Sequence, residues 1–522
     1  MGISLVTWSA YLLLASGLTF GQTAGGETPA LVGAASATAP QTGVARLTVR
    51  NEIVNTLDPR LFGQFMERAV DQGEYGPEAT LVPGTRKVMP AVIQLMTQVA
   101  PTILRFPGGG GVENGPSWTN LVDGAWDRTD YARPSSKTRQ GKMVGSEFGL
   151  DEFLKLTTDL KTEPLLVVSI SKSFHAWEKE TLAESIRGAQ AMVAYVNGEA
   201  EGSLPEDLRH WAQLRVRNGH AKPYGVRFWQ IGNEPIWNLC QHLIKAGKGK
   251  DEISRIYVQT LGAFIRAMRS VDPKIEVLVD VQMEDSQWVD IPVIDRVARE
   301  LGTQVQYLTC HSYKPLSIHI LQRARQPLEP KSLTAAEYWY AAQAVPFIDP
   351  ESGLSCYRPR TLTKARRYGY QMGVTEWNWN GWWQLHSAER RELPNWGLAK
   401  GVASAGFLHA FMREGDTIRL ATQSMFVGVA WDFAAIHVDA ARKMTPFVNP
   451  CGLVAGLYAR HHGNVVLPVT MENVGMVTQP IQMGEIVPAR KLALLDPVAT
   501  RTRNHLYLHV INRSFDQDIP VE

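Results

Sequence analysis

Eight short apolar runs recur along the chain, each separated from the next by at least two dozen residues. Runs of this length and composition are typical of parallel strands that are buried on both faces. The gaps between them are long enough for the crossover helix that parallel neighbours require. We therefore expect strands at residues 61–66, 102–106, 165–170, 226–232, 275–280, 305–310, 371–377 and 418–423.

Two of the gaps carry apolar residues at helical spacing, over residues 182–196 and 257–268. Eight strands that alternate with helices close naturally into a (β/α)8 barrel, an α/β fold whose centre is filled by inward side chains. An open, doubly wound sheet is the alternative. No G-x-G-x-x-G follows an early strand and the sequence has no P-loop, which disfavours that alternative.

A second, smaller domain is predicted outside these runs. Residues 45–50 alternate between apolar and polar side chains, and residues 465–469 and 506–511 are also strand-like. We expect an antiparallel β-sandwich near the C-terminus, to which the N-terminal strand returns. The predicted boundaries are 44–57 for that strand, 58–455 for the barrel and 456–522 for a sandwich that we expect to be incomplete.

The first 22 residues predict an export signal. Residues 1–20 contain no charged side chain and include Leu12-Leu13-Leu14, which is typical of the apolar core of a signal peptide. The basic segment that usually precedes such a core is missing, and an uncleaved membrane anchor is the alternative. Residues 23–43 are rich in Ala, Thr, Gly and Pro, which predicts a flexible leader. We expect export to the periplasm or beyond the cell.

Charge and cysteine content limit the classes of partner. With 53 Lys and Arg against 51 Asp and Glu, the net charge is +2, so we expect no nucleic-acid partner and no stable membrane partner after signal cleavage.

The four cysteines lack a C-x-x-C pair and are expected to be buried thiols, with one long-range disulfide left open. Cys240 and His242 are too few ligands for a metal centre. We expect no metal and no cofactor; the sequence does not decide between a monomer and a homo-oligomer.

Polar residues follow most of the predicted strands. The fourth run ends in Asn233 and Glu234, and the seventh ends in Glu376. Because the carboxyl ends of all barrel strands open onto one face, residues far apart in sequence converge there. The same argument adds Glu67, Arg105, His311, Tyr313 and Gln423. Taken singly, each has a structural alternative, such as an ion pair or a core position.

The two glutamates at strand ends predict the chemistry. Glu234 and Glu376 can face each other across a sugar, one protonating the leaving oxygen and the other attacking or stabilising the anomeric carbon. A helix cap or a salt bridge explains either glutamate alone, but not both together with their neighbours. The pattern therefore predicts a glycoside hydrolase with a carbohydrate as its partner.

Aromatic residues crowd the second of these glutamates. Four tryptophans fall within seven residues: Trp377, Trp379, Trp382 and Trp383. Flat indole faces suit the apolar faces of sugar rings, although core packing accounts for some of the four. We expect Trp382 or Trp383 to face the substrate. The glycine run 108–111 is similar to a phosphate cradle, but no Lys-Ser/Thr follows it.

Six motifs occur in order between residues 58 and 455: Leu61-Phe-Gly-Gln-Phe-Met-Glu67, Leu104-Arg-Phe-Pro-Gly-Gly109, Glu147-Phe-Gly-Leu-Asp-Glu-Phe153, Leu214-Arg-Val-Arg-Asn-Gly-His220, Ile231-Gly-Asn-Glu234 and Thr375-Glu-Trp-Asn378. Gly-Asn-Glu alone occurs in many barrel glycosidases, whereas the ordered set is much more specific. Together the motifs resemble the retaining α-L-arabinofuranosidases of glycoside hydrolase family fifty-one.

This resemblance implies a role for each glutamate. Glu234 would be the general acid/base and Glu376 the nucleophile, with Arg105 and Tyr313 favouring the ionised form of Glu376. Retention of configuration requires the two carboxyl groups to lie about 5 to 5.5 Å apart. The resemblance further implies that the sugar is contacted by Asn233 at its 2-hydroxyl, by Glu67 at other hydroxyls and by Gln423 in the pocket wall.

One departure from the family pattern concerns the sugar. The family continues Arg-x-Pro-Gly-Gly with an Asn that contacts the sugar, but this chain has Gly110. That contact is absent or is supplied by Glu113 or Asn114. The resemblance thus predicts an α-L-arabinofuranosidase acting on arabinose-containing polysaccharides or oligosaccharides, and Gly110 leaves a β-xylosidase or endo-β-glucanase on the same fold as the alternative. An inactive carbohydrate-binding barrel is a third reading, which the paired glutamates disfavour.

Overall fold

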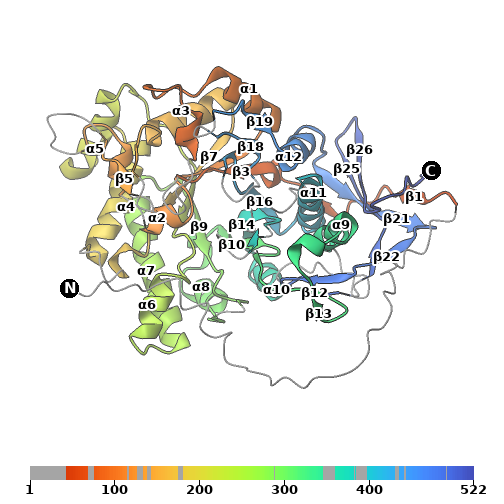
Figure 1. Cartoon of the computed structure of the whole chain (residues 1–522). Coiled ribbons are helices and arrows are strands. Elements are labelled where there is room, and N and C mark those ends of the chain that lie inside the picture. Colours follow the sequence, from red (N-terminus) through yellow and green to blue (C-terminus); the bar gives the residue numbers. More distant parts are fainter. Residues whose placement is uncertain are drawn as a thin grey trace. The chain divides into compact units, whose positions relative to one another are not determined.

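The computed structural model describes residues 43–522 except for 69–75, 115–116, 126–132, 138–142, 175–179, 287–288, 345–358, 381, 384–396, 430–433, 440–442 and 489–490. The described residues form a closed barrel of strands with helices around it, and smaller sheets built largely from the C-terminal segment (Figure 1).

Eight parallel strands form the barrel, hydrogen-bonded in the circular order β10, β14, β16, β3, β4, β7, β8, β9. Their bounds are β3 Gly63–Phe65, β4 Ile103–Phe106, β7 Glu163–Val168, β8 Phe228–Ile231, β9 Glu276–Asp280, β10 Tyr307–Tyr313, β14 Gln371–Asn378 and β16 Ile418–Gln423. Each strand overlaps one of the eight predicted runs, so the prediction of a (β/α)8 barrel is confirmed.

The strand sequences explain why the ring closes. β4 and β8 are buried along their whole length, as expected of strands covered on both sides. Inward side chains from six strands fill the centre: Ile103, Leu165, Phe228, Leu278, Tyr307 and Leu420. The outward side chains join a larger apolar cluster with the surrounding helices. The barrel is therefore a packed core that holds the strand ends at one face in fixed positions.

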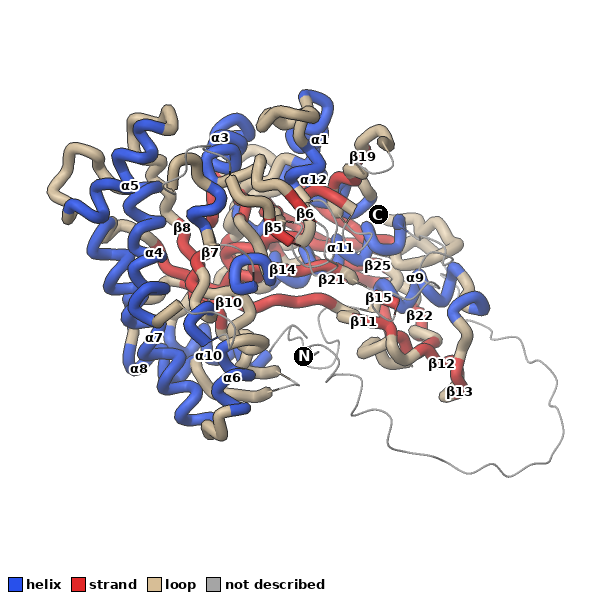
Figure 2. Tube along the Cα trace, turned by 60° about the vertical axis from the view of Figure 1, so that its left-hand side comes forward, coloured by secondary structure: helices blue, strands red, loops and turns tan. Residues whose placement is uncertain are grey.

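Helices cover the outside of the barrel. Figure 2 shows α4, α7 and α8 side by side, and contacts between them hold this layer together. The predicted helical periodicity over 182–196 and 257–268 is confirmed by α4 and α7. The helices are α1 Pro90–Val99, α2 Gly110–Asn114, α3 Leu150–Leu160, α4 Leu182–Asn197, α5 Glu206–Arg217, α6 Leu239–Lys245, α7 Lys250–Val271, α8 Ile294–Glu300, α9 Ala335–Gln343, α10 Pro359–Tyr368, α11 Gly397–Arg413 and α12 Pro450–Arg460.

The remaining strands form small sheets. A four-stranded sheet has the order β2 (Asn55–Thr56), β20 (Val465–Leu467), β25 (Leu495–Arg501) and β26 (Leu506–Asn512). The N-terminal strand β1 (Arg46–Val49) pairs antiparallel with β21 (Val469–Glu472). The strand near residue 45 thus returns to the C-terminal segment. The predicted end of the barrel, residue 455, lies within helix α12.

Several predictions about the chain concern residues that the structure does not describe. The N-terminal segment 1–42 and Cys356 are among them. Within the described ranges, Cys240, Cys310 and Cys451 are buried. No helix in the described part of the chain is long and apolar enough to cross a membrane.

A buried ion cluster joins the four-stranded sheet to the barrel. Asp496 on β25 forms ion pairs with Arg413 on α11 and, at 2.6 Å, with Arg513. His409, also on α11, lies 3.4 Å from the same carboxylate. Burial alone would raise the pKa of Asp496, but the two guanidinium groups outweigh it and hold that pKa well below its usual range. The cluster therefore stabilises the contact between the two parts only while Asp496 is ionised.

We predict that Asp496→Asn lowers the free energy of unfolding by about 3 to 5 kcal/mol at pH 7, because it leaves two guanidinium groups without their buried partner. A carboxyl group with a depressed folded-state pKa contributes stability that is present above its unfolded pKa and is lost as the pH falls through the folded value. The deficit of the variant should therefore shrink below about pH 4. Urea unfolding of the wild type and the variant between pH 7 and values below about pH 4 measures this difference in free energy, with the exposed Asp518→Asn as control. A deficit independent of pH would contradict the prediction.

Candidate active site

Glu234 and Glu376 face each other at the carboxyl ends of β8 and β14. An oxygen of each carboxyl group and a ring nitrogen of His311 all lie within 4.8 Å of one another. His311 Nδ1 is 2.8 Å from Glu234 Oε1 and 3.6 Å from Glu376 Oε2. The Glu376 side chain is only 6% exposed, whereas that of Glu234 is 24% exposed. Solvent therefore reaches Glu234 more readily than Glu376.

Arg105 on β4 neutralises the buried carboxyl group of Glu376. The guanidinium group is fully buried and donates to Glu376 Oε1 at 2.9 Å. It also donates to Asn233 Oδ1 at 2.6 Å and to Gln230 Oε1 at 2.9 Å. Because its other donors are engaged by β8 and the residues that follow it, Arg105 holds one fixed position against Glu376.

Tyr313, the last residue of β10, contacts the other oxygen of Glu376. Its hydroxyl group lies 2.8 Å from Glu376 Oε2 and 2.8 Å from Ser424 Oγ. Burial, reinforced by the charge of Glu376, raises the pKa of Tyr313 well above its ordinary value. The phenol therefore stays protonated and remains a hydrogen-bond donor, so each oxygen of Glu376 accepts a hydrogen bond, one from Arg105 and one from Tyr313.

Two glycines after β4 allow Glu67 to approach the same place. A Cβ atom on Gly109 would lie 2.8 Å from Glu376 Oε1 and 3.0 Å from Glu67 Oε1. Gly108 has a φ of +123°, and a Cβ there would lie 2.8 Å from the backbone of Glu67. Only glycine fits this conformation and spacing. The glycine run thus brings Glu67 close to Glu376, and its function here is close packing.

Gln423 closes β16 at the same rim. It lies opposite Trp377 and Gln64 in the strand register, and Gln64 Nε2 donates to Gln423 Oε1 at 2.9 Å. Both glutamine side chains are buried. The structure therefore brings together seven predicted site residues besides Gln423: Glu67, Arg105, Asn233, Glu234, His311, Tyr313 and Glu376.

The tryptophans divide into two groups. Trp377 and Trp379 are fully buried, the first against Phe407 and the second against Tyr338, so they belong to the core. Trp382 and Trp383 form β15, which pairs with β11 (Ser317–Ile318). Their side chains lie outside the described part of the structure. Substrate contact by Trp382 or Trp383 stays a prediction.

Asp280, which sequence reasoning missed, lies beneath Glu234. Its Oδ2 accepts the backbone N–H of Glu234 at 3.2 Å, and its Oδ1 accepts that of Gln282 at 2.8 Å. Burial raises its pKa to about 6, even though the neighbouring His311 opposes this. Glu234 itself has a left-handed backbone, with φ +47°. The missed signal is that Asp280 closes the fifth apolar run, at the same place where the other strands carry their polar residues.

Glu113, in α2, is one of the two residues suggested above to replace the family asparagine as a sugar contact. Its carboxyl group is fully buried and accepts hydrogen bonds from Ser169, Ile170, Ser171 and Asn233. The idea that Glu113 replaces the family asparagine as a sugar contact is therefore wrong, because no part of its side chain is exposed. The side chain of Asn114 lies outside the described part of the structure.

Among the described residues, Glu234, His311 and Glu376 are the set whose spacing could accommodate a metal ion. These groups already contact one another, and Glu376 is paired with the Arg105 cation, which disfavours a second cation. Cys240 is buried and lies 3.8 Å from Met283 Sδ, and burial raises the pKa of its thiol, whereas His242 is exposed. Cys240 and His242 therefore do not form a ligand pair.

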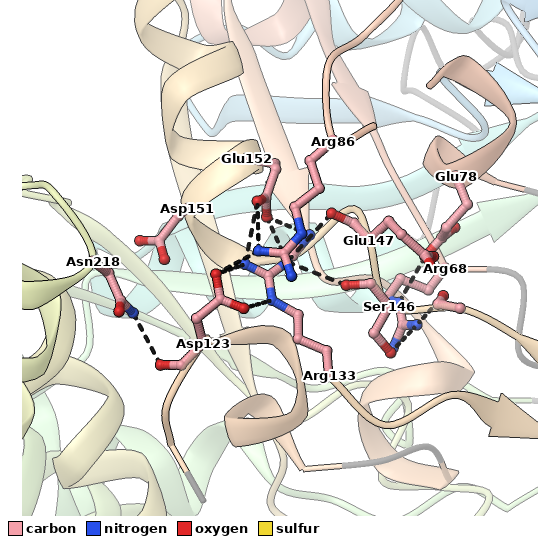
Figure 3. Close-up of polar contacts among 12 residues, drawn as sticks. Arg68, Glu78, Arg86, Asp123, Arg133, Ser146, Glu147, Asp151, Glu152 and Asn218 are labelled. Atoms are coloured by element: carbon pink, nitrogen blue, oxygen red, sulfur yellow. Dashed lines mark hydrogen bonds and ion pairs between the residues drawn. The ribbon is translucent and has the colours of Figure 1, made fainter. Parts of the chain in front are cut away.

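Two further motifs of the family resemblance have structural roles. Figure 3 shows Arg133 bound to Asp123 and Glu152, beside the pairing of Arg68 with Glu78. Asn218 donates to the backbone of Asp123 at 3.1 Å. Residues of motifs 147–153 and 214–220 thus bind Arg133 and Asp123. Arg68 directly follows Glu67, so this network also fixes the chain next to a site residue.

The comparisons with known proteins agree with this arrangement. Residues 95–315 match the family described as alpha-L-arabinofuranosidase 1 domain. The intracellular exo-alpha-(1->5)-L-arabinofuranosidase 1 of Bacillus subtilis (strain 168) is 27% identical over 280 residues, which cover 52% of this chain and 48% of that protein. The intracellular exo-alpha-(1->5)-L-arabinofuranosidase of Streptomyces lividans is 23% identical over 404 residues, covering 72% and 52%. The chain spans about half the length of these curated relatives.

Solved structures show the same fold. An α-L-arabinofuranosidase of family fifty-one from Thermotoga petrophila RKU-1 has a TM-score of 0.63 at 20% identity, covering 92% of this chain and 88% of that one. One from Bifidobacterium longum has a TM-score of 0.66 at 18% identity, covering 91% and 88%. The chain is therefore a (β/α)8 barrel with an appended β domain and two facing glutamates. In sequence and in fold it is similar to the α-L-arabinofuranosidases of glycoside hydrolase family fifty-one.

The raised pKa of Asp280 predicts a pH-dependent stability. Because the folded protein holds this proton up to about pH 6 and the unfolded chain releases it near pH 4, stability from the group is lost as the pH rises through that window. Asp280→Asn cannot titrate. Its unfolding free energy should therefore improve relative to the wild type by up to roughly 3 kcal/mol between pH 4 and pH 7. Urea unfolding of the variant and the wild type at about pH 4 and pH 7 measures this difference in free energy, with the exposed Asp159→Asn as control. Equal differences at the two pH values would refute it.

Proposed function

We propose that the protein is a retaining glycoside hydrolase that releases α-L-arabinofuranosyl groups from arabinose-containing polysaccharides or oligosaccharides. One observation supports this most: oxygens of Glu234 and Glu376 lie within 4.8 Å at the mouth of the barrel. A separation of about 5 to 5.5 Å between carboxyl groups suits direct attack on the anomeric carbon, whereas inversion needs space for an intervening water. The likeness to α-L-arabinofuranosidases supports the choice of sugar.

The first step of the reaction uses both glutamates. Glu376, ionised between Arg105 and Tyr313, attacks the anomeric carbon while the bond to the leaving oxygen breaks. Glu234 donates its proton to that oxygen, so the aglycone leaves as a neutral alcohol. Contact with His311 at 2.8 Å orients Glu234 for this transfer. The products of the step are a glycosyl ester on Glu376 and an ionised Glu234.

The second step reverses these roles. Glu234, now a base, takes a proton from water, and the water oxygen attacks the anomeric carbon of the ester. Glu376 leaves as a carboxylate, again stabilised by Arg105 and Tyr313. Two displacements at the same carbon restore its configuration. Arg105 and Tyr313 thus stabilise Glu376 in the two steps in which its carboxyl group loses or regains negative charge. Preorganised hydrogen-bond donors contribute most to the rate in such steps.

The remaining site residues bind the sugar in this proposal. Arg105 holds Asn233 Oδ1, so the amide nitrogen of Asn233 is left to donate to the 2-hydroxyl. Glu67 accepts from other hydroxyls, Gln423 lines the pocket wall, and Trp382 or Trp383 covers the ring or the leaving group. Bonds to the 2-hydroxyl strengthen as the transition state forms. A substitution that removes the side-chain amide of Asn233 should therefore lower kcat by a larger factor than it raises KM.

A panel of aryl glycosides tests the function. We predict turnover of the α-L-arabinofuranoside, with the α-anomer formed first, and a loss of about 10^2 to 10^4-fold or more in Glu234→Gln and in Glu376→Gln. Glu472→Gln, an exposed change, is the matched control and should keep full activity. Turnover of xylosides or glucosides instead would assign the same chemistry to another sugar. Binding without turnover in the wild type would rule out the enzyme proposal.

We also propose that the protein is exported, with residues 1–22 as the signal. The support is the uncharged apolar run that includes Leu12-Leu13-Leu14. Expression of the full chain in a Gram-negative host, followed by fractionation, should place it outside the cytoplasm, shortened at its N-terminus. Replacing Leu13 by Arg should block this export. A full-length product found only in the cytoplasm would refute the proposal, and one retained in the membrane would favour an anchor.

A further inference from the structure

Glu113 joins three neighbouring segments at the catalytic face. It belongs to α2, which follows β4, and its carboxyl group is fully buried. All four of its hydrogen-bond donors come from elsewhere: Ser169, Ile170 and Ser171 after β7, and Asn233 after β8. β4, β7 and β8 are consecutive strands of the barrel. A single carboxyl group therefore links the ends of three adjacent strands.

Each oxygen of Glu113 accepts two bonds. Oε1 accepts the backbone N–H of Asn233 at 2.8 Å and that of Ile170 at 3.3 Å. Oε2 accepts the hydroxyl of Ser169 at 2.5 Å and the backbone N–H of Ser171 at 2.9 Å. Burial raises the pKa of Glu113 and these donors oppose that effect. Three of the four donors are backbone N–H groups, which can only donate, and at least one of them faces each oxygen, so the site suits a carboxyl group and not an amide.

Gly232 allows the approach of Asn233 to Glu113. Its φ is +84°, and a Cβ atom there would lie 2.5 Å from Ile170 Cγ2 and 3.6 Å from Glu113 Oε1. The turn that follows β8 is thus packed directly against the Glu113 site. Asn233 is then held twice, through its backbone by Glu113 and through its side-chain oxygen by Arg105.

We propose that Glu113 is a positioning residue that fixes Asn233, and through it the contact with the sugar 2-hydroxyl. The inference rests on the proposed function, because it assumes that Asn233 contacts the substrate there. Glu113 does not itself touch substrate, since its side chain has no exposed surface. Its effect on rate arises because a small displacement of a group that binds the transition state costs a large part of its contribution.

Glu113→Gln is the sharpest single change. The amide nitrogen of the glutamine would occupy the position of either Oε1 or Oε2. At Oε1 it would face the backbone N–H groups of Asn233 and Ile170, and at Oε2 that of Ser171, so a donor would meet a donor in both cases. We expect kcat on the aryl arabinofuranoside to fall about 10- to 100-fold, with less than about a threefold change in KM. The matched control is Asp151→Asn, which alters a partly buried carboxyl group whose donors, Tyr195 and Tyr224, lie outside the site. It should leave kcat unchanged.

A double-mutant cycle separates positioning from general damage to the fold. If Glu113 acts through Asn233, the loss caused by Glu113→Gln should largely disappear when Asn233 is already alanine. A fall in kcat of the double variant by the product of the two single-variant losses would instead overturn the inference. So would an unchanged kcat in Glu113→Gln, whereas an inactive wild type would overturn the proposed function instead.

A milder variant covers the case in which Glu113→Gln does not fold. Ser169→Ala removes one donor to Oε2 and leaves the backbone bonds in place. We expect a fall in kcat of about two- to tenfold with KM unchanged, and no further fall in the Asn233→Ala background. A rise in KM at unchanged kcat in Ser169→Ala would overturn the inference.

Discussion

The ion pair between Arg105 and Glu376 is the constraint on which the rest of the site depends. The Glu376 side chain is 6% exposed and lies close to a second carboxyl group, so burying a negative charge there is costly without a nearby cation. Arg105 supplies that cation from β4, which β16 and β3 separate from β14 in the ring. Its own burial is tolerated because its donors are engaged by Glu376, Asn233 and Gln230. Glu376 contacts a cation and Glu234 contacts His311, so the two glutamates have different electrostatic environments at a short distance, which is the condition that acid/base and nucleophile roles require.

Close packing of backbone makes this arrangement possible. Gly108 and Gly109 leave no side chain between Glu67 and Glu376, so the turn after β4 passes directly against both acids. The glycine run looks like an anion-binding loop in sequence, yet its neighbours are carboxyl groups. Its two positions differ in what they demand: Gly108 needs a backbone conformation that other residues avoid, whereas Gly109 needs space. A side chain at either position would displace a carboxyl group and not merely fill a cavity.

The sequence predicts the barrel and most of the site because both depend on local signals. A strand covered on both faces must be apolar along its length, so the eight barrel strands are visible as apolar runs. Barrel topology then places the residue after each run on one face. Asp280 and Glu113 do not follow from that reasoning. Asp280 ends a run but its importance lies in which backbone N–H it accepts, and Glu113 acts on residues 56 or more positions away. Such pairings depend on how neighbouring loops pack, which periodicity does not encode.

Asp280 and Glu113 together explain how the Asn233–Glu234 pair keeps its conformation. Glu113 accepts the N–H of Asn233 and Asp280 accepts that of Glu234, so two successive backbone donors are held by carboxyl groups from opposite sides of β8. A left-handed backbone at a residue other than glycine costs of order 1 kcal/mol or more and persists only where surrounding bonds fix it. At Glu234, with φ +47°, those bonds are the ones described. In this conformation the carboxyl group of Glu234 contacts His311 and lies close to Glu376, while two fully buried acids accept the backbone N–H groups of Asn233 and Glu234.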